Sequence, residues 1–180
     1  ITIVAPFSPA EVFTEDGWFR TGDQADLSDA GRIRIKGRIK EIIVTSTGEK
    51  IPPTDMELAI QTDPLFEQVM VVGEARPFIT ALAVVNEAEW EKFAKEFNVN
   101  PSDDRMLMRR DIRMAALKRL KKAASRFPQY GIPRNIRLLK EHWTVDNGCL
   151  TVTMKLRRPI IREKLRAEID ELYTVPQNNV

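Results

Sequence analysis

The spacing of hydrophobic and polar positions changes from one short segment to the next along this chain. Residues 32–36 alternate between polar and apolar, which predicts a half-exposed strand. Residues 28–31, Ser-Asp-Ala-Gly, are typical of a tight hairpin turn before that strand. Residues 41–45 form a short apolar segment and predict another strand. The first quarter of the chain is therefore predicted to be loops and short strands.

Longer apolar runs appear only further along. Residues 68–73 and 80–85 are continuous apolar runs, which predict two paired central strands. Residues 135–140 predict one more strand.

Four segments have the pattern of helices. Thr54 and Glu57 have the spacing of a capping box, which predicts a helix from there to about residue 63. Asn86 is predicted to cap a second helix that ends near residue 97. Residues 104–125 predict a longer basic helix, and residues 159–172 a final one. The order β-α-β-β-α-α-β-α favours a compact α+β domain after a β-rich tail.

Composition narrows the class of protein. The chain has 180 residues, of which 43% are hydrophobic, which is ample for a packed core. The formal net charge of +2 does not indicate a polyanion partner. The single cysteine, Cys149, excludes an internal disulfide and fits a reducing compartment such as the cytoplasm. The sequence begins without Met or a charged leader, so we expect a fragment of a longer protein.

Two residues early in the chain have side chains suited to a nucleotide. Asp23 follows Gly22, and a carboxylate beside a glycine suits recognition of neighbouring hydroxyls such as a ribose diol. Arg38 carries a fork of donors able to hold ribose or phosphate oxygens. The structural alternatives are a turn cap for Asp23 and a strand-end salt bridge for Arg38. Trp18 and Phe19 are predicted to belong to the core.

Three later residues carry further candidate chemistry. Lys40 lies at the boundary between the β-rich tail and the α+β domain, where a few residues can absorb a backbone rotation. Gly48 lies in a loop and permits close approach of a ligand, although it also fits an ordinary turn. Lys155 lies in a loop of small polar residues, and its ammonium suits the stabilisation of developing negative charge. The alternative for Lys155 is a solvated surface lysine.

These segments together resemble the C-terminal motifs of the adenylate-forming superfamily, which includes acyl-CoA synthetases, peptide-synthetase adenylation domains and luciferases. Trp18-Phe-Arg-Thr-Gly-Asp23 matches its Tyr/Trp-x-x-Thr-Gly-Asp signature, and Gly37-Arg38 with Gly48 matches its hinge segment. Leu150-Thr-x-Thr-x-Lys-x-x-Arg158 is similar to the long-chain fatty acyl-CoA synthetase branch. So are Lys40, where most relatives carry Asp, and a helical insertion at about 86–127.

The resemblance implies a domain organisation and a role for each candidate. Residues 1–39 would be the tail of a large nucleotide-binding domain, and residues 40–180 a small mobile C-terminal domain with short sheets flanked by helices. Asp23 would hold the ribose of ATP and acyl-AMP with help from Arg38. Lys155 would bridge the substrate carboxylate and the α-phosphate. Rotation at Lys40 would then bring the loop around Gly48 to the site, where it lines the tunnel for CoA.

The implied substrates are a long-chain fatty acid, ATP with Mg²⁺, and coenzyme A. The phosphate loop, the metal-holding glutamate and the acyl tunnel of the family are absent from this sequence, so we expect the chain alone to be inactive. A fatty acyl-AMP ligase that loads a carrier protein is an alternative within the superfamily.

The basic segment at 105–126 leaves other interpretations open. It holds nine Lys or Arg and one acid, Asp111. A solvated helix face, an anionic membrane surface and the phosphates of CoA would all suit it, and peripheral attachment to the inner face of a membrane is one of these alternatives. A non-catalytic nucleic-acid-binding module is disfavoured by the near-neutral charge and the lack of interleaved aromatic residues. Tight, steeply salt-dependent retention on heparin would favour that module.

Overall fold

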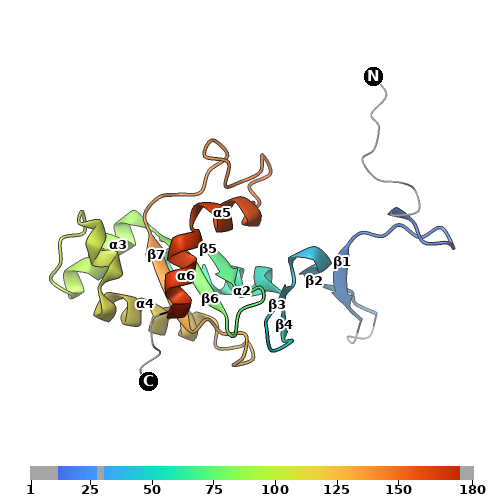
Figure 1. Cartoon of the computed structure of the whole chain (residues 1–180), viewed down its shortest axis with the longest axis horizontal. Helices are drawn as coiled ribbons and strands as arrows, with labels where there is room; N and C mark the ends of the chain where they lie inside the picture. Colours follow the sequence, from blue (N-terminus) through green and yellow to red (C-terminus); the bar gives the residue numbers. More distant parts are fainter. Residues whose placement is uncertain (1–11, 28–30, 175–180) are drawn as a thin grey trace. The chain divides into compact units, whose positions relative to one another are not determined.

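The computed structural model describes residues 12–27 and 31–174 (Figure 1). The chain divides into two compact units, Ile1–Ile42 and Ile43–Val180. None of the helices in the described parts of the chain is long and apolar enough to cross a membrane.

The first unit is built around one antiparallel pair of strands. β1 (Asp23–Asp26) pairs with β2 (Arg34–Arg38), and a register shift between Gln24 and Ala25 interrupts the ladder. The strand predicted at 32–36 therefore exists but begins and ends two residues later. Most of the turn predicted at 28–31 lies outside the described residues. A short 3-10 helix, η1 (Ile39–Glu41), follows β2.

The two aromatic residues of the first motif are not core residues. Trp18 is 73% exposed and Phe19 is 59% exposed, although the Phe19 ring meets the edge of Phe13. The prediction that both belong to the core is therefore wrong for this unit. Its two short strands offer too little apolar surface to bury large rings.

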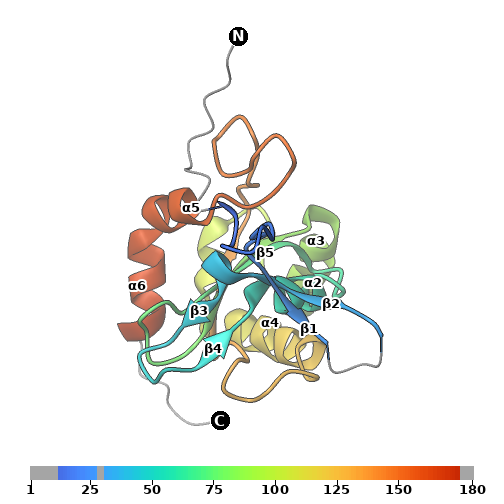
Figure 2. The ribbon, with the colours of Figure 1, turned by 90° about the vertical axis from the view of Figure 1, so that its right-hand side faces the viewer.

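The second unit is organised around a three-stranded sheet with the order β5-β6-β7. β5 (Phe66–Val72) and β6 (Thr80–Val85) pair antiparallel, and β7 (Asn135–Leu139) runs parallel to β6. All three strands were predicted from the sequence. Figure 2 shows helices on both sides of this sheet. This arrangement confirms the predicted α+β class of short sheets flanked by helices.

Alternate residues of each strand feed two separate cores, because successive side chains point to opposite faces. On one face, Val69 and Val71 pack with α2 (Pro53–Ile60), α3 (Glu87–Glu96) and α4 (Arg110–Ala123).

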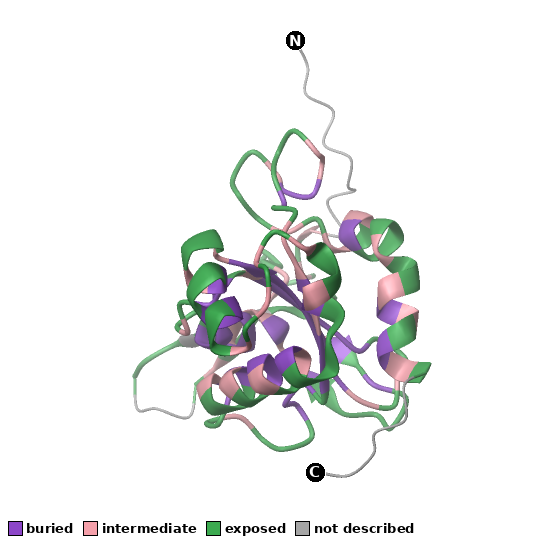
Figure 3. Cartoon of the chain, turned by 90° about the vertical axis from the view of Figure 1, so that its left-hand side faces the viewer, coloured by how far each residue is buried: buried purple, intermediate pink, exposed green. Residues whose placement is uncertain are grey.

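On the other face, Met70 and Val72 pack with α5 (Arg158–Lys164) and α6 (Arg166–Thr174). Burial on both faces explains why these strands have no polar alternation. Figure 3 shows the buried residues concentrated along the sheet and on the inner sides of the helices.

Two helix starts were predicted from the sequence; one is confirmed and the other is wrong. The Asn86 side chain accepts a hydrogen bond from the Glu89 N–H at 3.2 Å, which confirms the predicted cap of α3. The capping box predicted from Thr54 and Glu57 is wrong. α2 begins at Pro53 without a side-chain cap, since a proline in the first turn already has a helical φ and no N–H to satisfy.

Two predicted helices are interrupted. The basic segment at 104–125 contains a 3-10 turn, η2 (Asp104–Met108), and then α4, because Arg109 between them adopts φ −58° and ψ 134°. The final helix is split into α5 and α6 at Leu165, with φ −109° and ψ 29°. Both segments keep one apolar face, so their hydrophobic pattern did not reveal the breaks.

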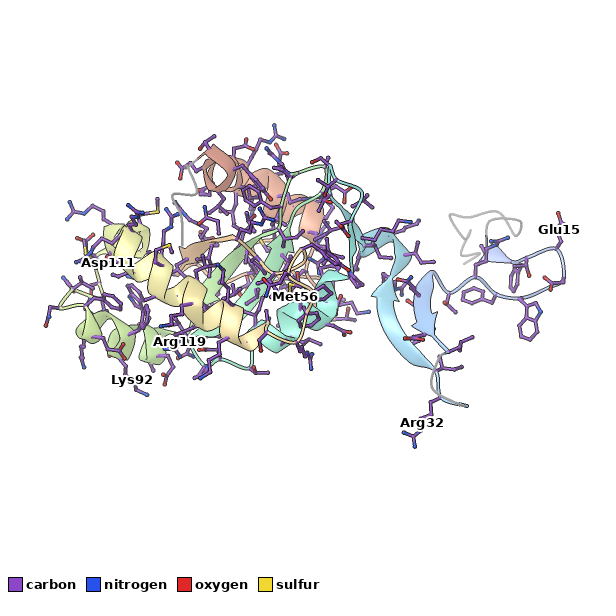
Figure 4. All side chains as sticks on the ribbon, turned by 90° about the horizontal axis from the view of Figure 1, so that it is seen from below. Glu15, Arg32, Met56, Lys92, Asp111 and Arg119 are labelled. Atoms are coloured by element: carbon purple, nitrogen blue, oxygen red, sulfur yellow. The ribbon has the colours of Figure 1, made fainter. Side chains whose placement is uncertain are left out.

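Part of the basic segment is bound within the domain. Arg119 of α4 makes a two-pronged contact with Asp63, Nε to Oδ2 at 2.9 Å and Nη2 to Oδ1 at 2.6 Å. Burial alone would raise the pKa of Asp63, but hydrogen bonds from Arg119 and the Leu65 N–H outweigh it and lower that pKa below its usual value. Figure 4 labels Arg119 on α4.

Candidate functional site

Asp23 and Arg38, predicted from separate segments, are direct neighbours. They are register partners across β1 and β2, and Arg38 Nε lies 3.0 Å from Asp23 Oδ1. Arg38 Nη1 also donates to the Thr21 carbonyl at 3.3 Å, and the Asp23 N–H donates to the Thr21 hydroxyl at 3.1 Å. The strand pair therefore holds both side chains in one orientation.

This pair is the strand-end ion pair that the structural alternative for Arg38 requires. It is also suited to a ligand, since the Asp23 side chain remains 33% exposed and the Arg38 side chain 55% exposed. A carboxylate that accepts from hydroxyls, beside a guanidinium that donates to oxygens, matches a ribose carrying a phosphate. Gly22 beside them has φ +75°, a conformation that favours glycine.

Lys40 lies near the end of the first unit. It is the middle residue of η1, its side chain is exposed, and the division between the units falls two residues later, after Ile42. Ile42 is extended, with φ −61° and ψ 120°, so the backbone changes conformation within this short segment. A change of a few dihedral angles here would reorient one unit against the other.

Gly48 lies at the tip of a hairpin. β3 (Ile43–Val44) and β4 (Lys50–Ile51) form the hairpin, so the strand predicted at 41–45 is real only in part. Gly48 has φ +85°, and a Cβ placed there would meet nothing within 4 Å. The backbone conformation therefore favours glycine, and the space beside it is open.

Lys155 lies in an exposed loop whose base is fixed. Leu150 and Leu156 form an isolated antiparallel bridge, and the Arg157 N–H donates to the Cys149 carbonyl at 2.8 Å. Cys149 and Leu150 are buried at this base, whereas Lys155 is exposed. We call residues 150–156 the lysine loop.

The hairpin tip and the lysine loop have the same turn. In both, a first threonine N–H donates to the carbonyl four residues later, at 3.0 Å for Thr45 and 2.9 Å for Thr151. The hydroxyl of that threonine contacts a second threonine hydroxyl two residues on, at 2.8 Å and 3.0 Å. It also accepts the N–H four residues on, at 3.1 Å in both turns.

The two turns differ at the fourth position, where the backbone is left-handed. That position is Gly48 at φ +85° in the hairpin and Met154 at φ +60° in the lysine loop. A residue with a side chain is strained there. The similarity of the two turns is visible in the sequence, because both segments read Thr-x-Thr.

Gly48→Ala is expected to lower the free energy of unfolding by about 1 kcal/mol, because alanine is strained at a positive φ. Met154→Gly is the matched control at the equivalent position and should not lower it. Urea unfolding of the two variants measures both values. Equal destabilisation by the two substitutions would show that backbone conformation is not what requires Gly48.

The two loops lie on opposite sides of the second unit. The β3–β4 hairpin is at the lower end of the unit and the lysine loop at the upper end in Figures 1 and 2. The two loops therefore project from different parts of this unit.

One residue of the region was missed by sequence reasoning. Glu57, assigned above to a capping box, is buried and bound to Arg158, two residues after the lysine loop. A signal was available, since Glu57 follows Met56 on the inward side of a short helix. A carboxylate at such a position needs a buried partner.

No three His, Cys, Asp or Glu side chains in the described ranges are grouped so as to hold a metal ion.

Comparisons with known proteins agree on one family. The model of the AMP-binding enzyme C-terminal domain matches residues 40–177. A long-chain fatty acid–CoA ligase of Mycobacterium tuberculosis is 34% identical over 171 residues, which are 91% of this chain and 27% of that protein. A chloroplastic long-chain fatty acid–[acyl-carrier-protein] ligase of Arabidopsis thaliana is 30% identical over 179 residues, 94% of this chain and 23% of that protein.

A solved structure has the same fold. The adenylation domain of a carboxylate reductase from Mycobacterium chelonae superposes with a TM-score of 0.77 at 25% identity, covering 92% of this chain and 24% of that one. The chain thus spans about a quarter of the length of the relatives that it matches.

Proposed function

The chain belongs to the AMP-binding enzyme C-terminal domain family, and on that premise we propose that it forms the C-terminal part of an ATP-dependent long-chain fatty acid–CoA ligase. The similar ligase of Mycobacterium tuberculosis supports the long-chain substrate and the CoA acceptor. The observation that carries the proposal is the placement of two candidate loops on opposite sides of one compact unit, which suits two half-reactions served in turn.

In the first half-reaction a fatty acid carboxylate oxygen attacks the α-phosphorus of ATP, and the bond to pyrophosphate breaks. Asp23 and Arg38 bind the ribose and orient the nucleotide. The Lys155 ammonium lies between the carboxylate and the α-phosphate and stabilises the negative charge that they share. Most of this contribution is positioning and charge stabilisation.

In the second half-reaction the CoA sulfur attacks the acyl carbon, its proton is released, and the bond to AMP breaks. The second unit rotates about Lys40, so that the lysine loop leaves and the Gly48 hairpin approaches. The open space beside Gly48 admits a narrow chain such as pantetheine.

A carrier protein is the second candidate acceptor, because the Arabidopsis relative is an acyl-carrier-protein ligase. The complete protein, given a long-chain fatty acid and ATP, should form acyl-CoA with free CoA as acceptor. Product formation only with a phosphopantetheinylated carrier protein would favour the alternative. If pyrophosphate release did not depend on the fatty acid, both candidate functions would be contradicted.

Asp23→Asn is expected to raise the KM for ATP by about tenfold to hundredfold in the complete protein, since a hydrogen bond to a charged group contributes about 1.5–3 kcal/mol. Steady-state kinetics at saturating fatty acid measure this change. Asp26→Asn removes a carboxylate from the other end of β1 and should leave the KM unchanged. Equal effects of both variants would show that Asp23 serves only the stability of the hairpin.

A further inference from the structure

Glu57 is a buried carboxylate with three hydrogen bonds. Its side chain is only 7% exposed. Arg158 Nη1 donates to Oε1 at 2.7 Å, and Nη2 donates to Oε2 at 2.6 Å. The Val71 N–H of β5 donates to Oε1 at 2.8 Å. The carboxylate therefore connects α2 and the central sheet with the residue at which α5 begins.

Arg158 lies three residues after Lys155. It is the first residue of α5, and no side chain caps that helix. The loop before it is closed by the Leu150–Leu156 bridge and by the Arg157 N–H on the Cys149 carbonyl. The contact with Glu57 therefore fixes the chain at the exit of the lysine loop, while Lys155 at its tip remains exposed.

The form of this contact indicates that it fixes the position of the chain and adds little to the stability of the fold. A buried ion pair often adds little stability over apolar side chains of similar volume. A two-pronged pair of a guanidinium and a carboxylate, in contrast, fixes distance and direction together. A pair of this kind suits a position at which the direction of a loop must be fixed.

We propose that Glu57 is a positioning residue for Lys155: by holding Arg158 it sets the direction in which the lysine loop presents its ammonium. This inference rests on the proposed function of Lys155. Glu57 itself touches neither substrate in this account.

The same domain provides a matched control. Asp63 holds Arg119 through a second two-pronged pair and also accepts from a backbone N–H, that of Leu65, at 3.0 Å. That pair joins the segment after α2 to α4 instead of to the lysine loop. Loss of either carboxylate should therefore weaken the fold in a similar way, but only loss of Glu57 should redirect Lys155.

The experiment uses the complete protein with Glu57→Gln, and with Asp63→Asn as control. Adenylate formation is measured by pyrophosphate release in a single turnover, and thioester formation by adding CoA to supplied acyl-adenylate. Glu57→Gln should slow the first by about tenfold to hundredfold through kcat, since small misplacements of a catalytic group have effects of this size. The KM for ATP and the second half-reaction should change less than twofold. Asp63→Asn should leave both half-reactions unchanged.

Arg158→Lys keeps the positive charge but loses the fork, so it should slow adenylation as Glu57→Gln does. The double variant should be no slower than either single one, because all three break the same contact. Arg158→Lys also serves as the test if Glu57→Gln fails to fold.

Equal loss of both half-reactions, or a loss that Asp63→Asn reproduces, would overturn the proposal and leave Glu57 a structural role. Unchanged adenylation in Glu57→Gln or Arg158→Lys would overturn it as well. If Lys155→Ala cripples adenylation while these variants do not, this inference alone fails. If Lys155→Ala leaves adenylation intact, the function proposed for Lys155 fails first.

Discussion

Lys155→Ala in the complete protein is expected to slow acyl-adenylate formation by about 10²–10³-fold, the usual effect of removing one group that stabilises transition-state charge. The ammonium lies on an exposed loop whose base is fixed by the Leu150–Leu156 bridge and by the Arg158–Glu57 contact. Nothing in the turn itself depends on the side chain, because its hydrogen bonds use the backbone of Lys155 and the hydroxyl of Thr151. The substitution should therefore remove a charge without disturbing the loop.

Thioester formation from supplied acyl-adenylate should survive this substitution, since we propose that the lysine loop is withdrawn during that step. Both half-reactions are measured separately, by pyrophosphate release and by acyl-CoA production. Lys164→Ala serves as the control, because Lys164 is an exposed lysine that contacts the Asn147 carbonyl near the loop base. Equal loss of the two half-reactions in Lys155→Ala would contradict the role assigned to Lys155.

Lys40→Pro should produce the reverse pattern. Proline fixes its own φ and disfavours the helical conformation of the residue before it, here Ile39 in η1. The segment between the units then has fewer conformations to change between. We expect acyl-adenylate to form and accumulate on the enzyme while thioester formation falls by about tenfold or more, because the domain motion before that step is hindered.

Lys40→Ala separates the backbone from the side chain. It removes the ammonium but keeps a flexible backbone, so it should retain the rate of acyl-CoA formation. Quenched-flow measurement of bound acyl-adenylate distinguishes the two variants. Undiminished acyl-CoA production by Lys40→Pro would place the pivot elsewhere in the chain.

The central sheet was predictable because strands buried on both faces leave long apolar runs, as in residues 80–85. The cap of α3 was predictable because Asn86 acts within its own helix. The breaks at Arg109 and Leu165 were not, because the apolar face continues across them. The exposure of Trp18 could not be inferred either, since exposure depends on how much other surface its unit supplies.

The candidate site divides in the same way. The pairing of Asp23 with Arg38 follows from the hairpin, which the residues between them indicated. The twin turns at Thr45 and Thr151 have local sequence signals. The contact of Glu57 with Arg158 joins residues 101 positions apart, and no local pattern reports such a partner. Local chemistry was therefore predictable, whereas the support of the lysine loop required the fold.

We propose that one small domain serves a single site with two loops in turn, by rotating about Lys40. Spin labels at Arg32→Cys in the first unit and Asp146→Cys beside the lysine loop test it directly, since both positions are exposed. The buried Cys149 and any cysteine elsewhere in the complete protein would be replaced. Pulsed electron-spin resonance then gives the distribution of distances between the labels.

We expect two distances whose populations reverse between two conditions, ATP with an unreactive fatty acid analogue, and an acyl-adenylate analogue with CoA. In Lys40→Pro one of the two distances should be lost. A single distance, unchanged between the two conditions in an active protein, would contradict the account.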